Sequence, residues 1–397
     1  MHGQIHSTTF TRILALDLGK FNTVSCLYPR SGGDHQFMGL RTTPQAVHDL
    51  LAQHVGDDPS QTLVVFETCD CAGWIYDIAV ALGFTVAVAN PAHEAWRWTR
   101  VKRKTDKDDA LKLARMSAMN QLPTVHMPDP QQRQRRRLVH HRRALVQRRT
   151  QIKNQVRSIF SQQGLELPRG TKCWTKAGIE QLRAMSQPIS RCEIDDLWKG
   201  RLHVELQLLV SLDKQLRKID QKLDALGRTD ERIKRLQTVP GVGPRLAEAV
   251  VVHLDDPHRF KSARQVSSYA GLVPKQLESG TMKRVGRITR RGPSLLRGML
   301  VEVAWMVYRH NDWARAFVQK VSRGMKQRKK IAIVALARRL LVKLWAMLRD
   351  GTSWRDPGGA GANQGEDVRF AHDRWRLSPP EDTAPVTALS SDGGMIG

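Results

Sequence analysis

Short apolar runs alternate with segments of helical period from Arg12 to Ala118, as in a mixed α/β domain. Three runs, separated by the turn signals Gly19 and Ser31-Gly32-Gly33, predict strands at residues 13–16, 23–28 and 35–40. The next segments predict a helix at 44–54, a strand at 62–67, a helix at 74–82 and a strand at 85–89. A helix with the acidic run 106–109 completes the order β-β-β-α-β-α-β-α. We therefore expect a first domain over residues 10–125.

A basic helix is predicted after Pro123. From Gln131 to Leu165 the chain has no acidic residue and few helix breakers. Like charges without interleaved acids repel in an isolated helix, so a helix that tracks phosphates is favoured over a merely solvated one. The side chains that we expect to contact nucleic acid are Arg135, Arg136, Arg142, Arg143, Arg149 and Lys153.

A heptad pattern of leucines marks the following segment. The series with one leucine at every seventh position is Leu202, Leu209, Leu216 and Leu223. The complementary positions hold Leu212, Ile219 and Leu226. Such a seam predicts a coiled coil, which either folds back on the basic helix within one chain or joins two chains. We expect residues 126–228 to form this basic, coiled-coil linker.

A third region, residues 229–350, opens with a glycine-rich turn between two helical patterns. The turn, residues 238–244, has the form of a helix-hairpin-helix element. In that element Gly241 and Gly243 would let backbone N–H groups approach a phosphate at a helix N-terminus. A plain corner between two helices is an equally good interpretation. Residues 351–397 are rich in Gly, Pro, Ser and Asp and predict a disordered tail.

The charge balance narrows the class of partner. With 64 Lys+Arg against 38 Asp+Glu, the formal net charge is +26 and the pI is about 10.5, which indicates a polyanion and by default a nucleic acid. The five cysteines fit neither a disulfide framework nor zinc-ligand spacing, and they indicate a reducing cytoplasm. The apolar segment 331–348 contains basic residues, so it predicts an amphipathic helix and no membrane partner.

Four acidic residues stand out in this basic chain. Asp17 ends the first apolar run and Glu67 ends the fourth, while Asp106 and Asp109 lie three residues apart. If their segment is helical, Asp106 and Asp109 project from one face and Asp108 points away, so Asp108 is left out. Clustered carboxylates without a counter-cation would have raised pKa values, and two divalent metal ions remove that conflict. Ligation by oxygen favours Mg²⁺ or Mn²⁺, so we predict a pair of such ions.

A second candidate for chemistry is Ser279, which precedes Gly280 in a polar loop. Taken alone, a Ser-Gly pair is normally only a turn. Its surroundings in the sequence are strongly cationic, with Lys275, Lys283, Arg284, Arg287, Arg290 and Arg291. Such a field suits a phosphodiester, so we expect these side chains to bind nucleic acid and Ser279 to be a candidate nucleophile.

These blocks together resemble one family. After the N-terminal acids, with Lys104-Thr105 before Asp106, come the motifs Val239–Pro244, Arg259–Gln265, Tyr269–Pro274, Ser279-Gly280 and Gly286–Gly292. This combination resembles the IS110/IS1111 family of DEDD transposases, to which the Piv-type DNA invertases also belong. The resemblance covers roughly residues 12–348. The N-terminal acids followed by the C-terminal motifs, in this order, are together highly specific. The tail after Gly351 and the stretch 165–200 depart from the family and inherit nothing from it.

The resemblance implies a fold and an assembly. The fold would be a RuvC-like domain of RNase H type, whose strand order agrees with the one predicted above, followed by a helical coiled-coil linker and a helical transposase domain. Family members assemble as oligomers, which implies a dimer or tetramer. The IS110 branch pairs a structured noncoding guide RNA with donor and target DNA. The expected setting is the bacterial cytoplasm, with association with the nucleoid when the protein is active.

The resemblance also implies a reaction. Such proteins cut and rejoin DNA strands at a composite site, so Asp17, Glu67, Asp106 and Asp109 would be Mg²⁺ ligands and Ser279 the nucleophile. A covalent phosphoserine would keep the bond energy of the cut strand, and rejoining would need no ATP.

Three other functions fit parts of the sequence. A RuvC-like junction nuclease would use the four carboxylates alone and would leave Ser279 without a task. An actin-like ATPase or sugar kinase would explain Asp17-Leu18-Gly19-Lys20, but it needs a second α/β half that residues 130–348 do not supply. A non-catalytic nucleic-acid-binding protein would tolerate the loss of any one carboxylate.

Overall fold

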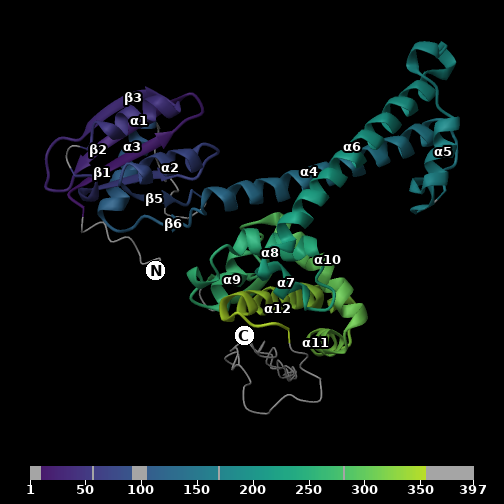
Figure 1. Cartoon of the computed structure of the whole chain (residues 1–397). Coiled ribbons are helices and arrows are strands. Elements are labelled where there is room, and N and C mark those ends of the chain that lie inside the picture. The colour runs from purple at the N-terminus through teal and green to yellow at the C-terminus, as the bar shows by residue number, and fades with distance from the viewer. Residues whose placement is uncertain (1–9, 56–57, 92–104, 169, 280–281, 355–397) are drawn as a thin grey trace, which may run out of the picture. The chain divides into compact units, whose positions relative to one another are not determined.

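The N-terminal region is built on a mixed sheet. The computed structural model describes residues 10–55, 58–91, 105–168, 170–279 and 282–354, without the side chains of 277–285. The strands are β1 (Arg12–Leu18), β2 (Asn22–Pro29), β3 (Gln36–Arg41), β4 (Thr62–Glu67), β5 (Thr85–Ala89) and β6 (Thr124–Val125). They lie in the order β3-β2-β1-β4-β5-β6 (Figure 1). The central strand β1 pairs antiparallel with β2 and parallel with β4, and β5 continues the parallel part.

Helices cover both faces of this sheet, because its central strands are apolar on both sides. The helices are α1 (Pro44–Ala52), α2 (Ala72–Ala81) and α3 (Asp106–Ala118). In β1, Leu14 and Leu16 belong to the core that α1 and α2 complete, while Ile13 and Ala15 belong to the core that α3 completes. The predicted element order is confirmed. The addition is β6, whose two residues are too few to produce an alternating pattern.

Two long helices form the middle of the chain. Helix α4 (Pro130–Gln162) packs along α6 (Leu197–Arg228), and α5 (Lys176–Ala184) lies between them in sequence (Figure 1). The leucines of the predicted seam, Leu202, Leu209, Leu216 and Leu223, are buried. Those at the complementary positions are only half-buried. Within this chain the seam therefore folds back on the basic helix, and a role in joining two chains stays a prediction.

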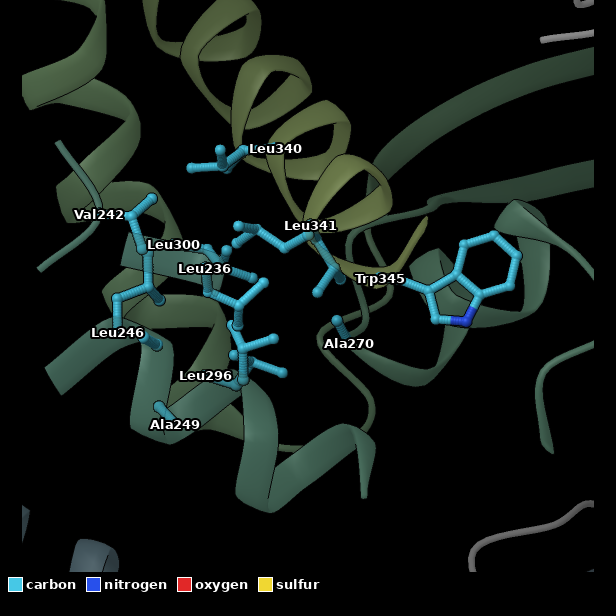
Figure 2. Packing of buried hydrophobic residues seen from close by; sticks show 14 of the residues in the cluster. Leu236, Val242, Leu246, Ala249, Ala270, Leu296, Leu300, Leu340, Leu341 and Trp345 are labelled. Carbon is cyan, nitrogen blue, oxygen red and sulfur yellow. The ribbon is translucent and has the colours of Figure 1, made fainter. Parts of the chain in front are cut away.

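A helical region with a single apolar core follows. Its helices are α7 (Glu231–Gln237), α8 (Pro244–Leu254), α9 (Ala263–Tyr269), α10 (Ser294–His310), α11 (Asp312–Ser322) and α12 (Lys329–Asp350). Figure 2 shows Leu340 and Leu341 of α12 on the side of leucines from the neighbouring helices, while Trp345 points to the other side. No helix within the described ranges is long and apolar enough to cross a membrane. The tail predicted at 351–397 lies outside the described residues after Trp354.

A β-hairpin interrupts the helices of this region. It consists of β7 (Pro274–Ser279) and β8 (Met282–Ile288), which pair antiparallel with Ser279 opposite Met282. The prediction of a polar loop for this segment was wrong. The two strands were not predicted because charged residues stand at many of their positions, so the alternation of apolar and polar residues that identifies a strand is missing.

Candidate active site and nucleic-acid surface

Asp17 and Glu67 lie side by side at one edge of the sheet. Each follows the last paired residues of two neighbouring parallel strands, Leu16 of β1 and Phe66 of β4. Side chains alternate between the faces of a strand, and Ala15 and Val65 pack under α3. Asp17 and Glu67 therefore both fall on the face that α3 covers. Both are half-buried.

Helix α3 brings its first turn to the same edge. Arg30, just after β2, donates from its Nη2 to the carbonyl oxygen of Ala118 at 3.4 Å, which fixes the C-terminal end of α3 near the edge where β1 begins. The helix has 13 residues and is about 20 Å long, so its first turn reaches the opposite edge, where β1 ends. Asp106 and Asp109 belong to that turn, with Asp106 exposed and Asp109 half-buried.

A capping box fixes the start of α3. The Thr105 hydroxyl accepts a hydrogen bond from the Asp108 N–H at 3.3 Å, and the Asp108 carboxylate accepts from the Thr105 N–H at 3.1 Å. Asp108 is therefore part of the cap, which agrees with its omission from the predicted ligands. The helical geometry puts Asp106 and Asp109 on one face, above Ala110 and Leu113 of the α3 core.

The four carboxylates are suitable ligands for a hard cation, but they do not form a complete coordination site. Their oxygens are the donors that Mg²⁺ and Mn²⁺ take. Within the described ranges, however, no three His, Cys, Asp or Glu side chains are close enough together to hold a metal ion. The four carboxylates at this edge therefore fit a divalent ion by the type of their donor atoms and by their position. Binding of the ion would have to bring their oxygens closer together.

Several arginines of the basic helix α4 form ion pairs with acids from later parts of the chain. Arg135 donates to Glu248 and, from Nη1, to Asp230 at 2.6 Å. The other ion pairs of the predicted phosphate-binding side chains are Arg142 with Asp220, Arg149 with Asp213, and Arg143 with Glu302 at 4.0 Å. No acid lies among these charges within α4, but they have acidic partners all the same, because the tertiary fold brings later helices to α4.

The remaining two basic residues of this set also have partners within the chain. Arg136 donates from Nε to the carbonyl oxygen of Val252 at 2.8 Å, and the Lys153 Nζ lies 5.0 Å from the centre of the Trp174 ring. A role of α4 in binding nucleic acid stays a prediction. Its arginines have a clear second role in packing the helix against α6 and α8.

Two groups at the α4–α8 interface have strongly shifted pKa values. Burial opposes ionisation of Asp230, but hydrogen bonds from Arg232 and Arg135 outweigh it and lower the pKa of this carboxyl to about 2. Burial and the neighbouring charge of Arg136 lower the pKa of His253 to about 3, so this histidine is neutral near pH 7. The interface therefore holds its ion pairs firmly at neutral pH and is sensitive to acid.

The hairpin carries its basic residues differently. Lys275, Arg287, Arg290 and Arg291 are exposed to solvent. The side chains of Ser279, Lys283 and Arg284 lie outside the described part of the chain. The backbone at the base of the hairpin is held by hydrogen bonds from the Thr289 N–H to Val273 and from the Arg290 N–H to Gly271. Exposed cations on a two-stranded ribbon form a surface that phosphates can reach.

The glycine-rich turn connects α7 to α8, as predicted. Gly241 has a φ of +86°, and a Cβ there would lie 2.9 Å from Val307 of α10, so Gly241 is needed to pack the turn. Gly243 is the N-cap of α8 and has open space beside it. Both earlier interpretations, a helix corner and a phosphate-binding turn, are compatible with this geometry, and phosphate binding stays a prediction.

One exposed residue near the carboxylate edge was missed by the sequence analysis. Phe21, in the turn between β1 and β2, is 72% exposed. Its signal in the sequence was an aromatic residue directly after the predicted turn Gly19-Lys20, where polar residues are usual.

The chain is similar to known transposases over most of its length. A family model described as "Transposase", of the DEDD IS110 type, matches residues 14–163, and one described as "Transposase IS116/IS110/IS902 family" matches residues 233–319. The transposase for insertion sequence element IS1111A of Coxiella burnetii is 28% identical over 303 residues, 74% of this chain and 79% of that protein. A probable family 20 transposase of Pseudomonas aeruginosa is 30% identical over 305 residues, 75% of this chain and 86% of that protein. A pilin gene-inverting protein of Moraxella bovis is 26% identical over 279 residues, 68% and 74% of the two chains.

Proposed function

Because the chain belongs to the IS116/IS110/IS902 family of transposases, we propose that it cuts and rejoins DNA strands with a carboxylate cluster and a serine nucleophile. The catalytic residues in this proposal are Asp17, Glu67, Asp106, Asp109 and Ser279. Residues 10–125 would be the RuvC-like catalytic domain, 126–228 the linker, and 229–350 the transposase domain that carries the serine.

The observation that supports this proposal most is the shared edge of the four acids. Asp17 and Glu67 end adjacent parallel strands, and the first turn of α3 reaches the same edge of the sheet. In a chain of net charge +26, a surface cluster of carboxylates would otherwise repel the nucleic acid that the rest of the chain attracts. A divalent cation would reverse that local repulsion, which is why the cluster favours catalysis over passive binding.

The carboxylates would hold Mg²⁺ or Mn²⁺, as a pair of ions. When bound, such ions neutralise charge that develops on the phosphodiester oxygens. The side chains themselves fix where the scissile phosphate lies, because Asp17 and Glu67 are anchored on strands and Asp106 and Asp109 on a capped helix.

Ser279 would supply the covalent step. Its hydroxyl oxygen forms a bond to phosphorus while the bond from phosphorus to the departing sugar oxygen breaks, and that oxygen takes the proton that the serine releases. Attack by a strand end on the phosphoserine reverses the step and regenerates the hydroxyl, so no energy source is consumed. The exposed cations Lys275 and Arg287 would hold the negatively charged strand at the hairpin.

The proposed partners are donor and target DNA, a structured noncoding guide RNA, and further copies of the chain in a dimer or tetramer. The composite site requires that the hairpin and the carboxylate edge meet, within one chain or between two. The proposed setting is the bacterial cytoplasm, at the nucleoid.

The test uses purified full-length protein and a plasmid that carries the element's own ends with its flanking noncoding segment. Asp17→Asn removes ligand charge and should lower Mg²⁺-dependent strand cutting by orders of magnitude. Asp34→Asn is the matched control, because Asp34 is an exposed acid in the β2–β3 connection, away from the carboxylate edge. Undiminished cutting by Asp17→Asn, or by wild type in EDTA, would overturn the proposal.

A further inference from the structure

The turn between β1 and β2 presents one aromatic ring to solvent at the carboxylate edge. Phe21 is 72% exposed, and the turn begins two residues after Asp17. A single exposed apolar residue is ordinary on a protein surface and needs no explanation by itself. Three further features of this turn set Phe21 apart: its rigid backbone, its neighbouring cation and its place beside the proposed ligands.

The backbone of the turn is clamped by Thr42. The Thr42 hydroxyl donates to the carbonyl oxygen of Gly19, and the Thr42 N–H donates to that of Phe21, both at 2.9 Å. The Thr42 hydroxyl also lies 2.8 Å from that of the buried Thr23. The turn is too tight for a side chain at Gly19, where a Cβ would lie 2.3 Å from the Asn22 carbonyl oxygen. The backbone that carries Phe21 is therefore held in place on both sides of Lys20.

The side chains of Lys20 and Phe21, in the turn between β1 and β2, can together bind a nucleotide. The Lys20 Nζ lies 5.1 Å from the centre of the Phe21 ring, so the exposed face of the turn combines an aromatic surface with a positive charge. Nucleic-acid-binding proteins that hold single strands use this combination, because a base stacks on the ring while the cation attracts the adjacent phosphate.

The Phe21 ring lies close in the chain to Asp17, one of the proposed metal ligands. Phe21 lies four positions after Asp17, which is at most about 13 Å of chain. Successive bases of a strand are about 3.4 Å apart, so the ring reaches a base within roughly four nucleotides of a phosphate held at Asp17. A strand held at Asp17 would therefore have a base within reach of the Phe21 ring.

We infer that Phe21 is a base-stacking residue that holds an unstacked DNA base beside the scissile phosphate, with Lys20 on the adjoining phosphate. This inference rests on the proposed function, because it takes the carboxylate edge to be where the DNA strand is cut. The ligand is a DNA base, since the edge acts on DNA. The role is positioning of the strand and not a chemical step.

The experiment measures stacking directly. Full-length protein in EDTA is titrated with a single-stranded oligothymidylate that contains one 2-aminopurine, whose fluorescence is quenched when the base stacks. Phe21→Ala should abolish the quenching and weaken binding roughly 5- to 100-fold. Phe21→Trp should restore both, whereas Phe21→Leu should restore neither, because it is apolar without a π-face. Lys20→Gln should keep the quenching and reduce the salt dependence of binding.

A matched control is Met306→Ala, which truncates an exposed apolar side chain on α10. It should leave quenching and affinity unchanged. The thermal midpoint of each variant is measured in parallel, and Phe21→Trp keeps the test valid if Phe21→Ala loses stability. Unchanged quenching in Phe21→Ala would overturn the inference. An RNA oligonucleotide of the same sequence is titrated in parallel, and quenching seen with the RNA but not with the DNA would also overturn it.

The two proposals fail in distinguishable ways. If the plasmid assay shows no strand cutting while Phe21-dependent quenching persists, the proposed function fails and stacking stands as a binding site alone. If cutting is normal and unaffected by Phe21→Ala, and quenching does not depend on Phe21, only the stacking role fails.

Discussion

Helix α4 and the β7–β8 hairpin have similar excesses of positive charge in the sequence but different charge environments in the structure. Four arginines of α4, Arg135, Arg142, Arg143 and Arg149, pair with acids from later parts of the chain, and the side chain of Arg135 is only 13% exposed. On and just after the hairpin, Lys275, Arg287 and Arg290 are exposed, and no ion pair involves them in the described part of the chain. A run of basic residues therefore does not by itself identify a phosphate-binding surface, because acids distant in sequence can neutralise it.

The largest effect is expected from the hairpin, if it carries the chemistry. Ser279→Ala should lower strand exchange and covalent protein–DNA adducts by about 10³-fold or more, because it removes the proposed nucleophile. Binding of DNA should stay nearly unchanged. The measurement is the yield of denaturant-resistant adducts on a gel, with Ser268→Ala, an exposed serine of α9, as the control. Adducts that persist in Ser279→Ala would remove the serine from the mechanism and favour a nuclease that uses carboxylates alone.

Next in size is the packing role of α4. Arg135→Gln should lower the free energy of unfolding by about 3–5 kcal/mol, because Glu248, whose side chain is 3% exposed, would be left buried without its partner. Arg137→Gln, an exposed arginine of the same helix, should change it little. Urea denaturation of both variants gives the comparison. Equal stabilities together with a loss of nucleic-acid affinity in Arg135→Gln would make α4 a phosphate-binding helix after all.

Charge removal from the two regions should affect binding unequally. Replacing Lys275 and Arg287 by Gln together should flatten the dependence of log affinity on log salt by about 0.9 for each lost contact with duplex DNA and about 0.7 with single strands. Replacing Arg137 and Arg148, which are exposed on α4, is the matched change in the other region. A salt titration of DNA affinity checks both variants. A larger change of slope from the α4 variant would reverse the comparison.

The last effect, which is small for each single step of pH, concerns acid sensitivity where α4 meets α8. The pKa of His253 is lowered from 6.5 to about 3 in the folded protein, so below pH 6.5 the unfolded chain binds a proton that the folded chain does not. The free energy of unfolding should therefore fall as the pH drops from 6.5 toward 3, by at most about 1.4 kcal/mol per pH unit. His253→Phe should flatten this dependence in urea titrations at several pH values. His141→Phe, an exposed histidine of α4, should not, and equal slopes in both variants would assign the acid sensitivity to other groups.

The N-terminal fold could be predicted because its information is local. Continuous apolar residues in β1 and in β4 indicate that both strands are central, and parallel pairing then brings Asp17 and Glu67 together. The capping box at Thr105 and Asp108 is likewise readable from four consecutive residues. For these elements the local pattern and the tertiary structure agree.

The partners of α4 could not be predicted, because they depend on which helices pack together. Nothing in the sequence around Arg135 indicates Glu248, which lies 113 positions away. The exposure of Phe21 could not be predicted for the same reason. The hydrogen bonds that hold its turn come from Thr42, which follows two further strands in the sequence. Charge and aromaticity are visible in a sequence, whereas their pairing and their accessibility are properties of the fold.

The capping box of α3 fixes the rotational phase of the helix as well as its first residue. Each residue turns an α-helix by about 100°, so the direction in which Asp106 and Asp109 project depends on where the helix begins. Because Thr105 and Asp108 bind each other's backbone, that beginning is tied to the residues immediately before the ligands. Insertion of one residue between Asp109 and Ala110 would turn both carboxylates away from the edge by about 100° while leaving the core of α3 intact. The spacing of this segment is therefore expected to tolerate substitution far better than any change in length.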